Sequence, residues 1–150
     1  METKEETLDI LNDLIRINND RIMGYERAIK ELQDEDADLK ALFTKMIGES
    51  HNFKLELGTE VQALGEDMTT EATTAGSIYR AWMDVKAAFT GHDRESIIAA
   101  CERGEDAAKS AYRAALEDDE LPAFLSEIIL RQSAIQQAAH DQIKALRDAS

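Results

Sequence analysis

Cysteine and proline occur once each in this sequence, as Cys101 and Pro122, and only seven of its 150 residues are glycine. A lone cysteine forms no disulfide within the chain and no CxxC pair, which is typical of a reducing cytoplasm. No apolar run approaches the length of a membrane-spanning helix, and residues 1–7 lack the apolar region of a signal peptide. We therefore expect a cytoplasmic protein.

Positive charge is also scarce. The chain has 17 lysines and arginines against 31 aspartates and glutamates, which gives a formal net charge of −14. Such a surface repels phosphate backbones and anionic lipid headgroups, so we expect neither a nucleic-acid nor a membrane partner. Apolar residues make up 43% of the chain and β-branched runs of strand length are missing, which predicts one all-α domain spanning residues 1–150.

Four long segments repeat apolar side chains every three or four residues, as the helices of a bundle do. They span Thr3–Gln33, residues 36–65, residues 94–117 and residues 121–146. The side chains expected to face inward are Leu8, Leu11, Ile15, Ile22, Tyr25, Ile29, Leu32, Leu39, Phe43, Met46, Phe53, Leu57, Val61, Leu64, Ile97, Cys101, Gly104, Ala108, Ala111, Ala115, Leu121, Leu125, Ile128, Ile135, Ala139, Ile143 and Leu146.

The order of these segments predicts two helical hairpins, at residues 3–65 and 94–148, joined by a crossover at residues 66–93 that contains a short helix over Ile78–Phe89. A four-helix bundle with one long crossover is the ferritin-like arrangement. The third long segment presents Gly104, Ala108 and Ala111 inward, so another helix can approach it closely. We expect a homodimer through this small-residue face or through the crossover helix.

Three polar residues interrupt the apolar stripes: Asn18, Ser50 and Gln132. Buried amides need hydrogen-bond partners, so these residues predict an interior polar layer. Such a layer can fix the register of the helices at some cost in stability. The alternative is that the three side chains line a small polar cavity.

Four stretches resemble a family of bacterial proteins: GYERAIKEL (24–32), SIYRAWMDVKAAFTGHDRESI (77–97), CERGEDAAKSAYRAAL (101–116) and AAHDQIKALRD (138–148). The family is an uncharacterised group of ferritin-like four-helix-bundle proteins of unknown function, and the resemblance covers nearly the whole chain. It implies the bundle fold and implies no activity.

Ferritin-like di-iron proteins carry a glutamate on one helix of each pair and a Glu-x-x-His motif on the other. The resemblance places the candidate metal ligands at Glu26, His51, Glu105 and His140, with Glu102 as an alternative to Glu105. Iron, manganese or zinc would be the metal of such a site.

Both Glu-x-x-His motifs are incomplete, because Gly48 stands three residues before His51 and Gln137 three before His140. A projection at ~100° per residue places His51 roughly 110°, and His140 roughly 90°, from the apolar stripe of its helix. We therefore expect no cofactor. The favoured interpretation is a non-catalytic bundle protein with a structural or partner-binding role, associated with stress by fold analogy. A degenerate metal-binding protein is the alternative.

A third hypothesis comes from residues 51–58, HNFKLELG, which resemble the His-x-x-Lys pattern of histidine phosphotransfer domains. An exposed His51 would accept the phosphoryl group, and Lys54, one turn later, would steady its charge. That pattern has glycine after the lysine, where this chain has Leu55. Cys101 lies on the small-residue stripe and is expected to be a buried thiol rather than a nucleophile.

Overall fold

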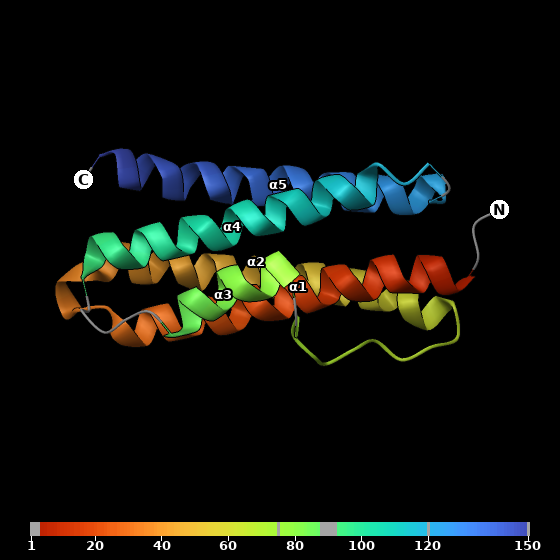
Figure 1. Cartoon of the computed structure of the whole chain (residues 1–150), viewed down its shortest axis with the longest axis horizontal. Helices are drawn as coiled ribbons and strands as arrows, with labels where there is room; N and C mark the ends of the chain where they lie inside the picture. The colour runs from red at the N-terminus through yellow and green to blue at the C-terminus, as the bar shows by residue number, and fades with distance from the viewer. Residues whose placement is uncertain (1–3, 75, 88–92, 120, 150) are drawn as a thin grey trace.

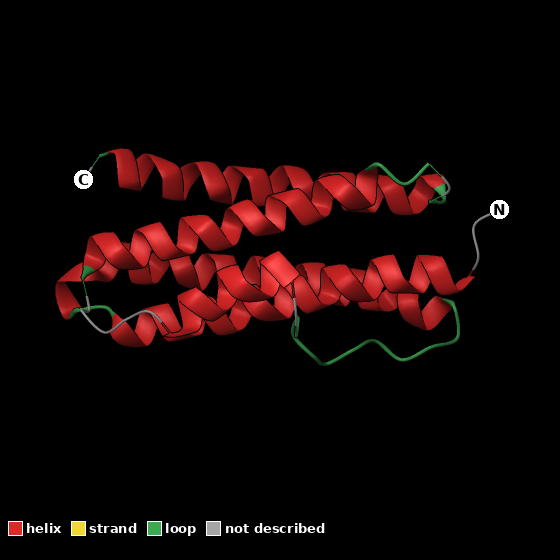
Figure 2. Ribbon diagram, in the orientation of Figure 1, coloured by secondary structure: helices red, strands yellow, loops and turns green. Residues whose placement is uncertain are grey.

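Helices account for most of the residues that the structure describes. The computed structural model describes residues 4–74, 76–87, 93–119 and 121–149, and these ranges contain no β-strand. The elements are α1 (Lys4–Glu31), the 3-10 turn η1 (Asp34–Asp36), α2 (Ala37–Ala63), α3 (Gly76–Ala87), α4 (Arg94–Leu116) and α5 (Ala123–Asp148). The all-α class expected from the composition is confirmed (Figure 2).

The four long helices form two antiparallel hairpins, α1 with α2 and α4 with α5 (Figure 1). Helices α2 and α4 run in the same direction, so the segment between them returns along the bundle from one end to the other. Residues 64–74 cover the first part of that return and α3 covers the second. This crossover gives the ferritin-like four-helix bundle that the sequence predicts.

Local chemistry sets several of the helix ends. Helix α2 stops two residues before Gly65, whose φ of +88° is the left-handed conformation that glycine adopts at low cost. The Asp93 carboxylate accepts a hydrogen bond from the Glu95 N–H at 3.1 Å and so caps α4. Pro122 is the N-cap of α5 rather than part of its first turn. The expected first-helix start at Thr3 and short-helix end at Phe89 lie outside the described residues.

The core is divided along the bundle axis into two apolar clusters. The first contains Tyr25, Ala28, Leu32, Leu39, Phe43, Met46, Trp82, Ile97, Ile98, Ala100, Cys101, Ala139 and Ile143. The second contains Leu11, Leu14, Ile15, Ile17, Leu57, Val61, Ala108, Tyr112, Ala115, Leu121, Leu125 and Ile129. The stretch between the two clusters holds polar side chains, and it is there that the candidate site lies.

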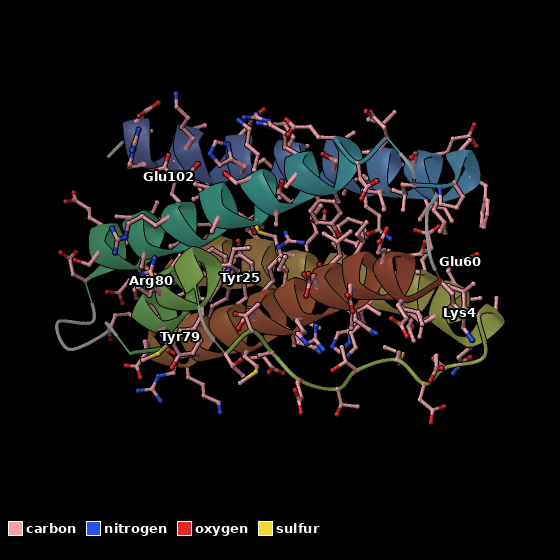
Figure 3. The ribbon with its side chains drawn as sticks, turned by 45° about the vertical axis from the view of Figure 1, so that its right-hand side comes forward. Lys4, Tyr25, Glu60, Tyr79, Arg80 and Glu102 are labelled. Carbon is pink, nitrogen blue, oxygen red and sulfur yellow. The ribbon has the colours of Figure 1, made fainter. Side chains whose placement is uncertain are left out.

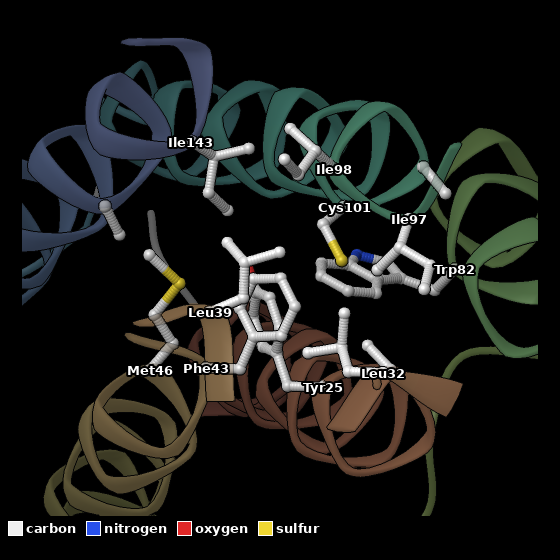
Figure 4. Close-up of a cluster of buried hydrophobic side chains, with 13 residues drawn as sticks. Tyr25, Leu32, Leu39, Phe43, Met46, Trp82, Ile97, Ile98, Cys101 and Ile143 are labelled. Carbon is white, nitrogen blue, oxygen red and sulfur yellow. The ribbon is translucent and has the colours of Figure 1, made fainter. Parts of the chain in front are cut away.

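Helix α3 packs against both α1 and α4 and thereby joins the two hairpins. Its Trp82 is fully buried, with its ring edge-on to Tyr25 at a centroid distance of 5.7 Å (Figure 4). The same ring rests on Gly104, where an added Cβ would lie 2.8 Å from the indole. Glycine at position 104 is therefore required by the close approach of α3.

Two expectations from the sequence need correction. Gly104 and Ala108 are buried within the chain, Gly104 beneath Trp82, so these two residues of the small-residue face are not free to form a dimer contact. On α5, Ile135 is 38% exposed and Gln136 is fully buried in its place. The first difference arises because the inward direction of a helix depends on which neighbours surround it, and α3 adds a neighbour for α4.

Candidate functional site

Between the two apolar clusters, α1 and α4 contribute a buried ion pair. Arg21 Nε donates a hydrogen bond to Glu105 Oε1 at 3.0 Å, and Arg21 Nη2 lies 2.9 Å from the same oxygen. Both side chains have no exposed surface. A charged pair in this position links the two hairpins through their interior, where water cannot screen it.

The remaining capacity of the Glu105 carboxylate is used by a second side chain of α1 and by one of α5. The Tyr25 hydroxyl donates a hydrogen bond to Oε1. Gln136 Nε2, from α5, lies 2.7 Å from Oε2 and 2.9 Å from the Glu105 backbone carbonyl. Both oxygens of Glu105 therefore already accept hydrogen bonds from the protein.

Burial and charge shift the titration of the surrounding groups. Burial by itself lowers the pKa of Arg21, but the charge and hydrogen bond of Glu105, together with Tyr25 and Tyr112, outweigh it, so the pKa of Arg21 is raised. Burial, reinforced by the negative charge of Glu105, raises the pKa of Tyr25 well above its ordinary value. Arg21 is thus a permanent cation and Tyr25 a permanent hydrogen-bond donor at this centre.

A second polar layer lies one turn away and crosses the bundle. Asn18 Nδ2 donates to the Tyr112 hydroxyl at 2.9 Å, and this hydroxyl donates to Gln132 Oε1 at 2.7 Å. Gln132 Nε2 continues to Glu56 Oε1 at 2.8 Å, so helices α1, α4, α5 and α2 are connected in series. Ser50 is buried, but its hydroxyl donates to the Met46 carbonyl of its own helix.

Glu49 of α2 is the other carboxylate near the centre, with Oε1 3.9 Å from Arg21 Nη2. Its side chain lines a surface cavity of about 340 Å³ between α2 and α5. Burial raises the pKa of Glu49, although the positive charge of Arg21 opposes the shift. The guanidinium therefore lies within reach of two carboxylates that come from different hairpins.

This arrangement does not fit the di-metal site implied by the ferritin-like fold. A divalent cation at Glu105 would have to displace Arg21, Tyr25 and Gln136, and it would meet the positive charge of the guanidinium. Within the described residues, no group of three or more His, Cys, Asp and Glu side chains is placed to hold a metal ion. No metal-dependent chemistry is derived for this centre.

The structure does not bring the four candidate ligands together. Glu105 is buried at the centre, whereas the side chains of Glu26 and His51 are exposed. Lys54 is half-buried on the same helix as His51, and Leu55 is 61% exposed.

His140 lies outside the centre, between two carboxylates. Its Nε2 is 2.6 Å from Asp106 Oδ1 on α4, and its Nδ1 is 3.2 Å from Asp141 Oδ1. Although the helical projection put His140 away from the apolar stripe, its side chain is only 8% exposed because α4 covers it. Glu102, the alternative to Glu105, accepts a hydrogen bond from Arg147 Nη1 at 2.6 Å instead.

Cys101 is fully buried among apolar side chains, next to Trp82 (Figure 4). Burial raises the pKa of its thiol, and the negative charge of Glu105 raises it further. The expected buried thiol is what the structure shows, and a protonated thiol without access to solvent is a poor nucleophile.

Sequence reasoning missed three residues of the site: Arg21, Tyr112 and Gln136. A signal for Arg21 was present, since Ile17, Asn18 and Tyr25 stand three or four residues away on the same helical face. An arginine on an apolar face needs a buried acid as its partner, and Glu105 on α4 is that acid.

A comparison with solved structures supports the fold. A mutant of Dps1 from Mycobacterium smegmatis is similar to this chain with a TM-score of 0.80 and 9% sequence identity, over 96% of each chain. At that identity the likeness concerns the fold alone. No curated protein matches the sequence.

The described part of the chain contains no helix long and apolar enough to cross a membrane. Residues 6–118, most of the sequence, match the family described as "Domain of unknown function (DUF2383)". The chain therefore belongs to the DUF2383 family.

Proposed function

We propose that this protein is a non-catalytic ferritin-like bundle with a structural or partner-binding role. The observation that carries the proposal is the complete use of the Glu105 carboxylate by Arg21, Tyr25 and Gln136. A catalytic carboxylate needs a lone pair for a substrate, a proton or a metal, and it needs access to the reactant. Glu105 has hydrogen-bond partners on both oxygens and no exposed surface.

The surroundings of the centre support the same function. The guanidinium offsets the carboxylate charge, and the hydrogen bonds from α1 and α5 hold both groups in place. A fixed pair of this kind favours one register of the two hairpins, as polar layers do in coiled coils. We propose that it determines which helix faces lie outside and are available to a partner.

The setting of the protein follows from its charge and from fold analogy. We propose a cytoplasmic protein, associated with stress, that forms assemblies with further copies or with another protein. The net charge of −14 supports a partner that is neither a nucleic acid nor an anionic membrane. The stress association rests on the ferritin-like fold alone.

Metal analysis of untagged protein tests this proposal. After incubation with Fe²⁺, Mn²⁺ or Zn²⁺ and removal of unbound metal, we expect elemental analysis to find substoichiometric metal. A Glu105→Gln variant should retain the same trace amount, because the carboxylate is not a ligand. Stoichiometric metal that is lost in Glu105→Gln would overturn the proposal in favour of a degenerate metal-binding protein.

Phosphotransfer at His51 is a second candidate, favoured by the exposure of the His51 side chain on α2. Leu55, where the phosphotransfer pattern has glycine, projects into solvent beside it. The test is acid-labile phosphate on the protein after incubation with a phosphorylated response regulator. Equal labelling of a His51→Gln variant would eliminate this candidate.

A further inference from the structure

A cavity of about 480 Å³ opens on the side of the bundle where the two hairpins meet. It lies between the N-terminal half of α1, the C-terminal half of α4 and the start of α3. Most of its lining is apolar, and the main contributors are Ile10, Leu14, Ile17, Ile78, Ala111 and Ala115. Leu14 and Ile17 form a deep floor, since both are almost fully buried.

The cavity continues the groove in which α3 lies. Helix α3 packs against α1 and α4 along one half of their interface (Figure 1), and its first residues, Gly76 and Ile78, line the cavity. Small side chains of α4 permit the approach in both halves: Gly104 beneath Trp82, and Ala111, Ala114 and Ala115 along the cavity. The unfilled half is therefore lined on α4 by small side chains, as is the half that already holds a helix.

The contacts of α3 show how such a helix is held. Trp82 enters the bundle and meets Tyr25, while Tyr79 is half-buried and Arg80 is exposed on the outer side (Figure 3). An occupant of the free half would likewise direct apolar side chains at positions i, i+3 and i+4 inward and keep its polar side chains outside.

The rim of the cavity is acidic. Asp118, which follows α4, and Asp13 of α1, which also pairs with Arg16, line it directly. Asp9 and Glu117 are exposed at the same end of the bundle, where α1 begins and α4 ends (Figure 1). With a chain charge of −14, this rim repels a second copy of the protein and attracts a basic segment.

We propose that this α1–α4 groove binds an amphipathic helix of another protein, with apolar side chains in the cavity and lysines or arginines against the acidic rim. The inference rests on the proposed partner-binding function and adds the surface and the chemistry of the partner. Affinity comes from burial of the cavity lining, and the charges set orientation and association rate.

Two synthetic peptides with the α3 sequence, residues 76–87, provide the probe. The basic peptide carries Asp84→Lys, and the acidic peptide carries Arg80→Glu and Lys86→Glu, so the apolar stripe is identical in both. Fluorescein-labelled peptides are titrated with the full chain and followed by anisotropy. We expect one basic peptide per chain, binding that weakens as salt is raised, and binding of the acidic peptide weaker by about tenfold or more.

Two variants locate the binding site. Ala114→Trp fills the cavity from its exposed edge, and Ala134→Trp adds the same side chain to an exposed position of α5. We expect Ala114→Trp to weaken binding of the basic peptide by about tenfold or more and Ala134→Trp to leave its affinity unchanged. Thermal unfolding of both variants checks that each is folded.

Several outcomes would overturn the inference. Equal binding of both peptides, equal binding to Ala114→Trp, or no binding of the basic peptide would each contradict it. Concentration-dependent dimerisation of the wild-type chain that is lost in Ala114→Trp would assign the groove to a second copy. None of these outcomes depends on metal content, so this inference and the proposed function fail separately.

Discussion

Arg21 of α1 and Glu105 of α4 are both fully buried, and Arg21 Nη2 lies 2.9 Å from Glu105 Oε1 across the interface between the two helical hairpins. Neither helix contacts the other extensively elsewhere, because α3 lies between them over part of their length. The pair is therefore a buried ionic link between the two hairpins, in addition to the Asn18–Tyr112 and Gln132–Glu56 hydrogen bonds, the packing of α3 and apolar contacts.

Removing the guanidinium should destabilise the fold strongly. In Arg21→Met, Glu105 becomes an uncompensated buried charge, and we expect a loss of about 3–5 kcal/mol in the free energy of unfolding. Urea unfolding followed by circular dichroism measures it. Arg16→Met on the same helix is the control, since Arg16 pairs with Asp13 near the surface and should cost less than about 1 kcal/mol. Similar losses in both variants would contradict a special role for the buried pair.

Gly104→Ala should displace the crossover helix. The added Cβ would lie 2.8 Å from the Trp82 ring, and relief of this overlap moves α3 outward, at a cost of about 1–3 kcal/mol. Trp82 is the only tryptophan, so its fluorescence should shift to longer wavelength.

Gly48→Ala is the matched control for that change. Gly48 lies within α2 and has no atom within 4 Å of an added Cβ. The substitution should leave tryptophan emission unchanged and stabilise the chain by about 0.5–1 kcal/mol, because alanine favours helix more than glycine does. Unchanged emission in Gly104→Ala as well would show that α3 is not seated on that residue.

Glu49 predicts a pH dependence of stability. Burial raises the pKa of Glu49 in the folded state above its ordinary value of 4.5, so the unfolded chain loses this proton first as pH rises. Stability contributed by Glu49 is therefore present at low pH and lost as pH rises through the folded pKa. We expect Glu49→Gln to be more stable than wild type at pH 7, with the difference vanishing below about pH 4.

Glu56 predicts a pH dependence of stability with the opposite sign to that of Glu49. Burial raises the pKa of Glu56, but the hydrogen bonds from Arg131 and Gln132 lower it by more. The pKa of Glu56 therefore lies below its ordinary value. Glu56→Gln should therefore be less stable than wild type above pH 4.5, and the loss should disappear as pH falls. Unfolding curves across this range distinguish the two glutamates, and equal slopes for both variants would contradict the assignment.

Tyr112→Phe should break the second polar layer. The variant removes the hydroxyl that accepts from Asn18 and donates to Gln132, leaving two buried amides short of a partner. We expect a loss of about 1–3 kcal/mol in the free energy of unfolding. Tyr79→Phe, at a half-buried position of α3, should lower the free energy of unfolding by less. An unchanged midpoint for Tyr112→Phe would show that the layer does not bind the helices together.

Much of the fold could be predicted from the spacing of apolar residues. The stripe from Leu39 to Val61 is buried in the structure as expected, and Asp93 caps α4. The direction of the crossover could not be predicted, because periodicity within a helix carries no information on which end of the bundle the next helix starts from. Gly104 was recognised as a close-contact position, but the partner is Trp82 of the same chain rather than another copy.

The site was predicted less well than the fold. Glu105 was singled out as a metal candidate by position, whereas the residue that neutralises it is on α1, 84 residues earlier in the sequence. That pairing depends on the relative register of two helices from different hairpins, which is settled by packing between them. Asn18 and Gln132 were recognised as interior polar residues, but Tyr112, which connects them, has the apolar ring of an ordinary core residue.

The cation at the heart of this bundle is attached to the polypeptide by covalent bonds. A chelator cannot remove the Arg21 guanidinium, and a metal ion cannot exchange with it. The charge of Glu105 is offset as soon as the chain folds. The positive charge beside Glu105 is therefore the same whether iron is scarce or abundant.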